Sequence, residues 1–99
     1  MGKKSEPWEI ELYRAVDEVL FYIWDPIGVS RSPEARNEYH SYLPQVYALL
    51  TNSSTAGEIS HYLGSVIQYM GLSQQNPKHD AEVAEVLLHW RDVIRKRYA

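Results

Sequence analysis

Apolar side chains recur every three or four residues in four separate segments of this 99-residue chain. This spacing places them on one face of an α-helix, whereas a strand requires alternation of apolar and polar residues. No pair of alternating segments predicts a β-hairpin. The sequence therefore predicts an all-α fold, a compact bundle-like domain of four main helices joined by short connections. The length corresponds to one domain over residues 1–99, with residues 1–6 as a flexible N-terminus.

The first predicted helix runs from about Pro7 to Trp24, with Ser5 or Glu6 as its N-cap. Its last six residues, 19–24, are apolar on every side, and such a helix is usually central in its domain or contacts a partner. A strand over these six residues is the weaker alternative, because the spacing upstream is helical. The predicted apolar stripe comprises Leu12, Tyr13, Val16, Val19, Leu20 and Ile23.

Turn-forming residues interrupt the chain after the first helix. Pro26 disfavours helical dihedral angles at the residue before it, and Gly28 supplies a positive φ in the turn. Ser32 and Pro33 together form a helix-start signal. This signal predicts a short extra helical turn near residues 33–38.

The second main stripe lies between residues 39 and 50 and is interrupted by Pro44. Either Ser41 caps a new helix with Pro44 in its first turn, or one continuous helix kinks at the proline. The break is the favoured interpretation, because proline is tolerated in the first turn of a helix and removes a hydrogen bond further inside.

Capping signals delimit the last two predicted helices. The third begins at a capping box formed by Thr55 and Glu58 and ends near Gly71. The fourth begins at Asn76, which precedes a proline, and runs to about Arg97. One side of this fourth helix is lined by Val83, Leu87, Trp90 and Ile94.

Composition excludes several classes of function. The chain has no cysteine, so it has no disulfide scaffold, thiolate metal site or cysteine nucleophile. Ten basic residues face 13 acidic ones, a net charge of −3 that argues against nucleic acid as a partner. No segment approaches the roughly 18 consecutive apolar residues of a membrane span, and none resembles a signal peptide. We expect a cytoplasmic protein without a membrane partner.

Catalytic and metal-binding signatures are missing from the sequence. The four histidines form no His-Glu-x-x-His motif, and the five glycines form no phosphate-binding loop. We therefore predict a protein that is not an enzyme, with no catalytic residue, no cofactor and no metal. The alternative of a small-molecule binder or enzyme would use Asp25, Tyr39, Tyr42 and His61 around a pocket.

The turn Trp24-Asp25-Pro26-Ile27-Gly28 has two interpretations. In the structural one, Trp24 fills the end of the bundle and Asp25 accepts amide hydrogen bonds in an Asx-type turn. In the functional one, Asp25 stays free near Arg31 or Arg36 and meets a ligand or partner. The structural interpretation is favoured because the turn chemistry alone accounts for these residue types.

Residues from about 10 to 75 resemble a family of small bacterial helical proteins of unknown function. The family pattern is a Trp-Asp-Pro-Ile-Gly turn, then Glu-Tyr-x-x-Tyr, then a helix ending near Gly-Leu. His40 stands where that pattern has an acidic residue. The resemblance implies a cytoplasmic all-α fold, no assigned catalytic residue, and a link to bacterial toxin systems. The motifs that carry it are Trp24-Asp25-Pro26-Ile27-Gly28, Glu38-Tyr39-His40-Ser41-Tyr42-Leu43-Pro44, Glu58-Ile59-Ser60-His61-Tyr62-Leu63 and Met70-Gly71-Leu72.

Tyrosine and tryptophan dominate the aromatic residues, with eight and three copies against one phenylalanine. Both suit interfaces, because they combine an apolar body with a polar tip. We therefore predict a non-catalytic protein–protein interaction domain, of which an acidic inhibitor of the immunity or antitoxin type is one form. The alternative is a homo-oligomeric structural protein, a homodimer in the commonest case. Its partner is another protein or a second copy. The candidate contact residues are Phe21, Tyr22, Trp24, Asp25, Tyr39 and Tyr42, the first three for a homodimer.

Overall fold

A computed structural model describes residues 5–99, which form helices and turns without a strand, so the all-α prediction is confirmed. Four α-helices carry the fold, and three short segments of tighter or wider helix lie between the first and the second. In chain order the elements are α1 (Pro7–Glu18), the π-helix η1 (Val19–Trp24), the 3₁₀ turns η2 (Pro33–Ala35) and η3 (His40–Tyr42), α2 (Leu43–Thr51), α3 (Ala56–Tyr69) and α4 (Pro77–Arg97).

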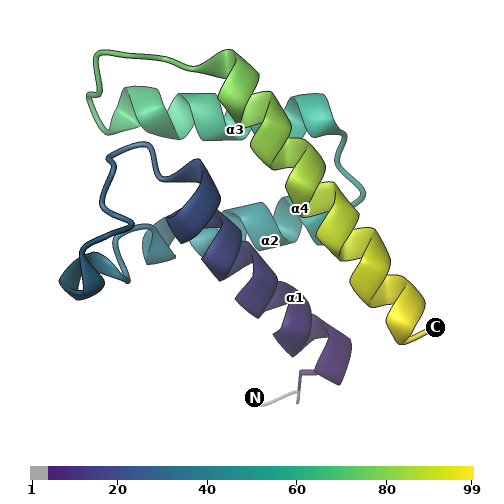
Figure 1. Cartoon of the computed structure of the whole chain (residues 1–99). Helices are drawn as coiled ribbons and strands as arrows, with labels where there is room; N and C mark the ends of the chain where they lie inside the picture. The colour runs from purple at the N-terminus through teal and green to yellow at the C-terminus, as the bar shows by residue number, and fades with distance from the viewer. Residues whose placement is uncertain (1–4) are drawn as a thin grey trace.

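Two antiparallel pairs of helices make up the domain (Figure 1). α1 and α4 lie side by side and run in opposite directions. Their outer ends are joined where Glu11 accepts a hydrogen bond from the Tyr98 hydroxyl at 2.9 Å and pairs with Arg97. α2 and α3 also run in opposite directions and cross α1 and α4 in this view, and α3 packs most extensively against α4. The four apolar faces therefore meet between the pairs.

The first predicted helix ends at Trp24, as expected, but its last six residues are wider than an α-helix. The Asp25 amide donates to the Leu20 carbonyl at 3.0 Å, five residues back, which is the π-helical spacing. Four of the six η1 side chains, including Phe21, are buried. The widened turn therefore directs most of this apolar run into the core.

Most of the helix starts and ends predicted from capping residues and prolines agree with the structure. Thr55 forms the expected capping box, and Asn76 caps α4 by accepting from the His79 amide at 3.2 Å. The chain breaks before α2, and Pro44 lies in its first turn. However, the N-cap position is occupied by Tyr42 and not by Ser41, because the preceding residues form the separate turn η3.

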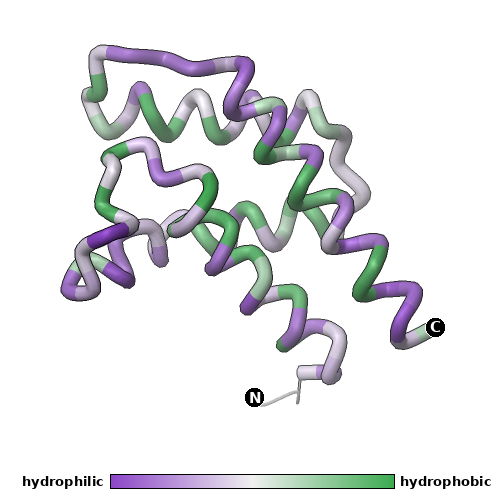
Figure 2. The backbone as a smooth tube through the Cα atoms, in the orientation of Figure 1, coloured by the Kyte–Doolittle hydropathy of each residue, from purple (hydrophilic) through white to green (hydrophobic). Residues whose placement is uncertain are grey.

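One core lies between the helix pairs, and Figure 2 shows the apolar stretches of each helix that supply it. The segment between α3 and α4 is by contrast hydrophilic. The single buried charged residue among the described positions is Asp80. The buried apolar side chains are Leu12, Val16, Val19, Leu20, Phe21, Trp24, Tyr39, Leu43, Val46, Leu50, Ile59, Leu63, Val66, Ile67, Val83, Ala84, Leu87 and Ile94.

The start of α1 is fixed by Glu9, whose carboxylate accepts from the Glu6 amide at 2.6 Å. The expected flexible N-terminus at residues 1–6 falls mainly on residues 1–4, which lie outside the described part of the chain. Within residues 5–99, no helix has both the length and the apolar character needed to cross a bilayer.

Leu63 is fully buried on α3, so Leu63→Asp would place an unpaired charge in the core. This costs several kcal/mol, a large part of the roughly 5–15 kcal/mol that stabilise a small domain. We expect loss of the cooperative thermal transition by circular dichroism. The matched control is Tyr69→Asp on the same helix, where the side chain is 82% exposed and the melt should be unchanged. A cooperative melt in Leu63→Asp would contradict the core assignment.

Candidate interaction site

The end of η1 is joined to the start of α4 by side chains of both segments. The Trp24 indole N–H donates to Asp80 Oδ1 at 3.0 Å in a buried hydrogen bond. His79 Nε2 donates to the carbonyl of Ile23 at 2.8 Å and lies 3.3 Å from that of Trp24. Because the last carbonyls of a helix lack partners within it, His79 satisfies groups that η1 leaves open.

Asp25 organises the turn that follows. Its backbone is left-handed, with φ of 36°, a conformation that Asp adopts more readily than most residues. Its carboxylate accepts from the amides of Gly28, Val29 and Ser30 at 2.8–3.1 Å. It also accepts from the Tyr39 hydroxyl at 2.7 Å. Asp25 is therefore not free, and the structural interpretation of this turn accounts for it.

The ionisation of this pair reflects the same contacts. Burial raises the pKa of the Asp25 carboxyl, but hydrogen bonds from Tyr39 and two backbone amides outweigh burial and hold that pKa below its ordinary value. Burial and the hydrogen bond to Asp25 together raise the pKa of Tyr39. The Tyr39 hydroxyl also accepts from the Ile27 amide at 3.0 Å. Residues 25–39 are thus closed into a loop around one carboxylate.

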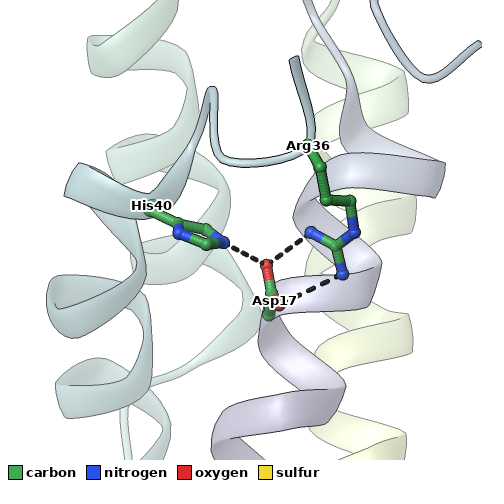
Figure 3. Close-up of polar contacts among 3 residues, drawn as sticks. All are labelled: Asp17, Arg36 and His40. Atoms are coloured by element: carbon green, nitrogen blue, oxygen red, sulfur yellow. Dashed lines mark hydrogen bonds and ion pairs between the residues drawn. The ribbon is translucent and has the colours of Figure 1, made fainter. Parts of the chain in front are cut away.

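A second polar cluster ties this loop to α1, as Figure 3 shows. Arg36 donates two hydrogen bonds to the Asp17 carboxylate at 2.9 and 3.1 Å, and His40 Nε2 lies 3.1 Å from the same carboxylate. The Arg36 guanidinium also stacks over the rings of Phe21 and Tyr22, at 4.9 and 5.3 Å from their centroids. Arg36 therefore holds the loop against α1 and η1 by both charge and stacking.

The predicted contact residues occupy different environments. Phe21, Trp24 and Tyr39 are buried in the core at 2% exposure, and Tyr42 is half-buried. Tyr22 alone among the predicted aromatic residues is well exposed, at 58%. Tyr22 is therefore the predicted aromatic residue that is most accessible to a partner of the folded domain.

The four residues of the predicted small-molecule pocket are only partly brought together. Asp25 and Tyr39 are in contact through their hydrogen bond. His61 lines a hollow formed by α3 and the start of α4, and none of the other three lines that hollow. Within residues 5–99, no group of three or more histidine or carboxylate side chains is placed to hold a metal ion.

An apolar groove runs between α1 with η1 and α4. It encloses about 380 Å³ and is lined by Tyr22, Ile23 and Trp90, with Ala15 and Val19 among the residues at its base. Ile23 and Trp90 lie on the predicted apolar stripes, but their side chains are 44% and 40% exposed. Helical spacing identifies a face, but it does not say where the neighbouring helix ends.

Comparisons with family models, curated proteins and solved structures found no match to this chain. The family resemblance described above therefore stays a prediction. The groove is the feature on which we base a functional proposal.

Replacing Asp25 by Asn tests the turn, since Asn tolerates the left-handed backbone but has one acceptor oxygen in place of two. We expect a loss of about 1–3 kcal/mol in unfolding free energy at neutral pH. The pKa of Asp25 is lower in the folded state than in the unfolded state. Asp25 therefore stabilises the fold fully at a pH above its ordinary, unfolded-state pKa, and this stabilisation is lost as the pH falls through its folded-state pKa. Urea denaturation between neutral and strongly acidic pH measures this difference.

The matched control is Asp92→Asn, at a side chain that is 65% exposed, where stability should change by less than about 0.5 kcal/mol. A difference between wild type and Asp25→Asn that grows on acidification would contradict the assignment.

Proposed function

We propose that this protein is a non-catalytic protein-interaction domain whose contact surface is the groove between α1 with η1 and α4. The observation that carries the proposal is the gathering of Tyr22, Ile23 and Trp90 around one open apolar hollow. Isolated exposed apolar residues are ordinary on protein surfaces, whereas a contiguous apolar hollow with a charged rim is typical of a contact site.

Tyr22 has the properties of an interface anchor. Its ring packs edge-on against buried Phe21, with 4.8 Å between centroids, and Arg36 stacks on it. Arg36 is itself held by Asp17. A side chain fixed in this way loses little conformational freedom on binding, so more of the contact energy is retained as affinity. Tyrosine, tryptophan and arginine are also the residues most enriched among binding hot spots.

The rim of the groove indicates the chemistry of the partner. Arg14 and Glu18 line it one helical turn apart, and neither forms an ion pair with another described residue. A complementary partner therefore presents an apolar ridge flanked by one acidic and one basic side chain. Such a ridge is readily supplied by an amphipathic helix, which fits a groove between two helices.

A second copy of the chain is the second candidate partner. The Arg14 and Glu18 pattern is self-complementary, because a two-fold axis brings the basic residue of one copy to the acidic residue of the other. The protein would then be a homodimer, with the groove at its subunit contact.

An inhibitor of the immunity or antitoxin type remains one form of this proposal, acting in the cytoplasm on a basic partner. An inhibitor of this type would use acidic side chains to contact its partner, but two of these side chains already pair with other residues of the chain. Asp17 binds Arg36 and His40, and Glu11 binds Arg97 and Tyr98. The apolar groove is therefore the stronger support.

Site-specific photo-crosslinking tests the proposal in cells that make the protein natively. A photo-reactive phenylalanine replaces Tyr22 or Trp90 and, as the control, Tyr69, which is 82% exposed outside the groove. We expect a discrete adduct with one protein from the groove positions and none from position 69. An adduct of twice the chain mass would select the homodimer. Absence of an adduct, or equal yields at position 69, would contradict the groove as a contact site.

Reconstitution with the identified partner gives the quantitative test. Truncating an anchor by Trp90→Ser should weaken binding by about 2 kcal/mol, roughly 30-fold, with the thermal melt preserved because Trp90 is a surface residue. Tyr69→Ser should leave affinity unchanged. Isothermal titration calorimetry measures both, and equal affinity for Trp90→Ser and wild type would refute the assignment of Trp90 as an anchor.

A further inference from the structure

Asp80 is a buried carboxylate with one oxygen that the fold does not use. The residue is 2% exposed, and its hydrogen bond with Trp24 uses Oδ1 alone. An uncharged acceptor such as the amide oxygen of asparagine would serve the Trp24 indole equally well. The position of Asp80 in the first turn of α4 favours a negative charge there, but these structural roles leave Oδ2 without a partner among the described side chains.

This charge has no cationic partner in residues 5–99. None of the lysine or arginine side chains forms an ion pair with Asp80. Burial raises the pKa of its carboxyl, although the hydrogen bond from Trp24 and the nearby His79 oppose that effect. Buried carboxylates without a counter-charge are costly, so proteins seldom keep one where a neutral isostere would fit.

The second oxygen of Asp80 opens onto a polar trough between α3 and the start of α4. The trough encloses about 500 Å³ and is lined by Gly57, Ser60, His61, Gly64, Ser65, Gln68, Gln75, Pro77 and Asp80. Every fully enclosed side-chain nitrogen or oxygen in residues 5–99 has a hydrogen-bond partner, whereas Asp80 Oδ2 has none. Oδ2 is therefore not sealed in the core and is reachable from the trough.

Gly64 keeps the approach to this oxygen open. A Cβ atom at Gly64 would lie 3.6 Å from Asp80 Oδ2 and 4.0 Å from Gln75 Oε1. Two acceptor oxygens from different segments thus face one point above a residue without a side chain. A ligand at that point would meet both oxygens and would be excluded by a methyl group there.

The two serine hydroxyls that line the trough favour a hydrogen-bond donor as the ligand. The Ser60 hydroxyl donates to the Gly57 carbonyl at 3.1 Å, and the Ser65 hydroxyl donates to the Tyr62 carbonyl at 2.7 Å. Because their hydrogens are engaged within α3, these hydroxyls offer only lone pairs to the trough. A hydrogen-bond donor therefore matches the two hydroxyls and the carboxylate on this side of the trough.

We propose that the trough is a binding site for a cationic N–H donor, a guanidinium or primary ammonium group, with Asp80 Oδ2 as its charged acceptor and Gln75 as a second acceptor. Charge-assisted hydrogen bonds of this kind are among the strongest in proteins. A metal ion fits less well, because one carboxylate is too few for a hard cation. This site is separate from the groove, which Asp80 does not line.

The Trp24 indole resonance reports on the site in solution, because the indole N–H is hydrogen-bonded to the same carboxylate. ¹⁵N-labelled protein is titrated with methylguanidinium chloride at constant ionic strength. We expect a saturable shift of the Trp24 indole and of the Gly64 amide. Tetramethylammonium, which has charge but no N–H donor, should produce neither. Equal responses to both cations would mean general screening and would overturn the proposal.

Two variants separate binding from folding. Asp80→Asn keeps the acceptor for Trp24 and removes the charge, and Gly64→Ala places a methyl group beside Oδ2 in a helix that alanine favours. Both should retain a cooperative thermal melt and bind methylguanidinium at least about tenfold more weakly. Wild-type affinity in either folded variant would overturn the proposal. Trp90→Ser should bind methylguanidinium normally, which distinguishes failure here from failure at the groove.

A second titration identifies the source of the cation. A capped Gly-Arg-Gly peptide carries the same guanidinium on a protein backbone. Tighter binding of the peptide than of methylguanidinium would support an arginine side chain of another protein as the ligand. Tighter binding of the free ion would support a small solute. No saturable shift with either probe would refute the site.

Discussion

The hydrogen bond from the Trp24 indole to Asp80 joins two segments that lie 56 residues apart in the chain. It is buried, and it fixes the end of the first helical segment to the start of the last one. Removal of the indole would leave the carboxylate with no partner, which costs more than the bond itself contributes. His79 reinforces the same junction by donating to the carbonyl of Ile23. This junction fixes one end of the antiparallel pairing of α1 with α4, and the contacts of Glu11 with Arg97 and Tyr98 fix the other.

The irregular segment after Trp24 follows from the same constraint. Once Trp24 points into the core, the chain must leave η1 sharply, and the left-handed backbone of Asp25 provides that exit. The Asp25 carboxylate then accepts hydrogen bonds from three backbone amides and from the Tyr39 hydroxyl. The ion pair between Arg36 and Asp17 holds the loop against α1. The charged side chains of this segment therefore stabilise its fold through contacts within the chain. This explains why the conspicuous turn motif contributes more to the fold than to an exposed site.

Sequence reasoning predicted most of the fold because helix periodicity and capping are local. Glu6, Thr55 and Asn76 each mark a helix start through contacts within four residues. The sites were less predictable because they depend on which helices become neighbours. The sequence around Asp80 is the same as that expected for a solvated acid near a helix N-terminus. The sequence around Trp90 is likewise that of a core residue on the same apolar stripe. Both assignments require the packing of α4 against α1 and α3.

The two proposed sites share α4 and are still physically separable. Asp80 and Trp90 are ten residues apart, which corresponds to about 15 Å along the helix and about 80° around it. Asp80 lines the trough beside α3 and a further hollow beside Tyr22 and Ile23, while Trp90 lines the groove beside α1. A change at one position removes no contact at the other, and effects of sites this far apart usually add. The Trp24 junction offers a route for coupling between them, since Trp24 contacts Asp80 directly and follows Ile23, and Tyr22, Ile23 and Asp80 also line one shared hollow.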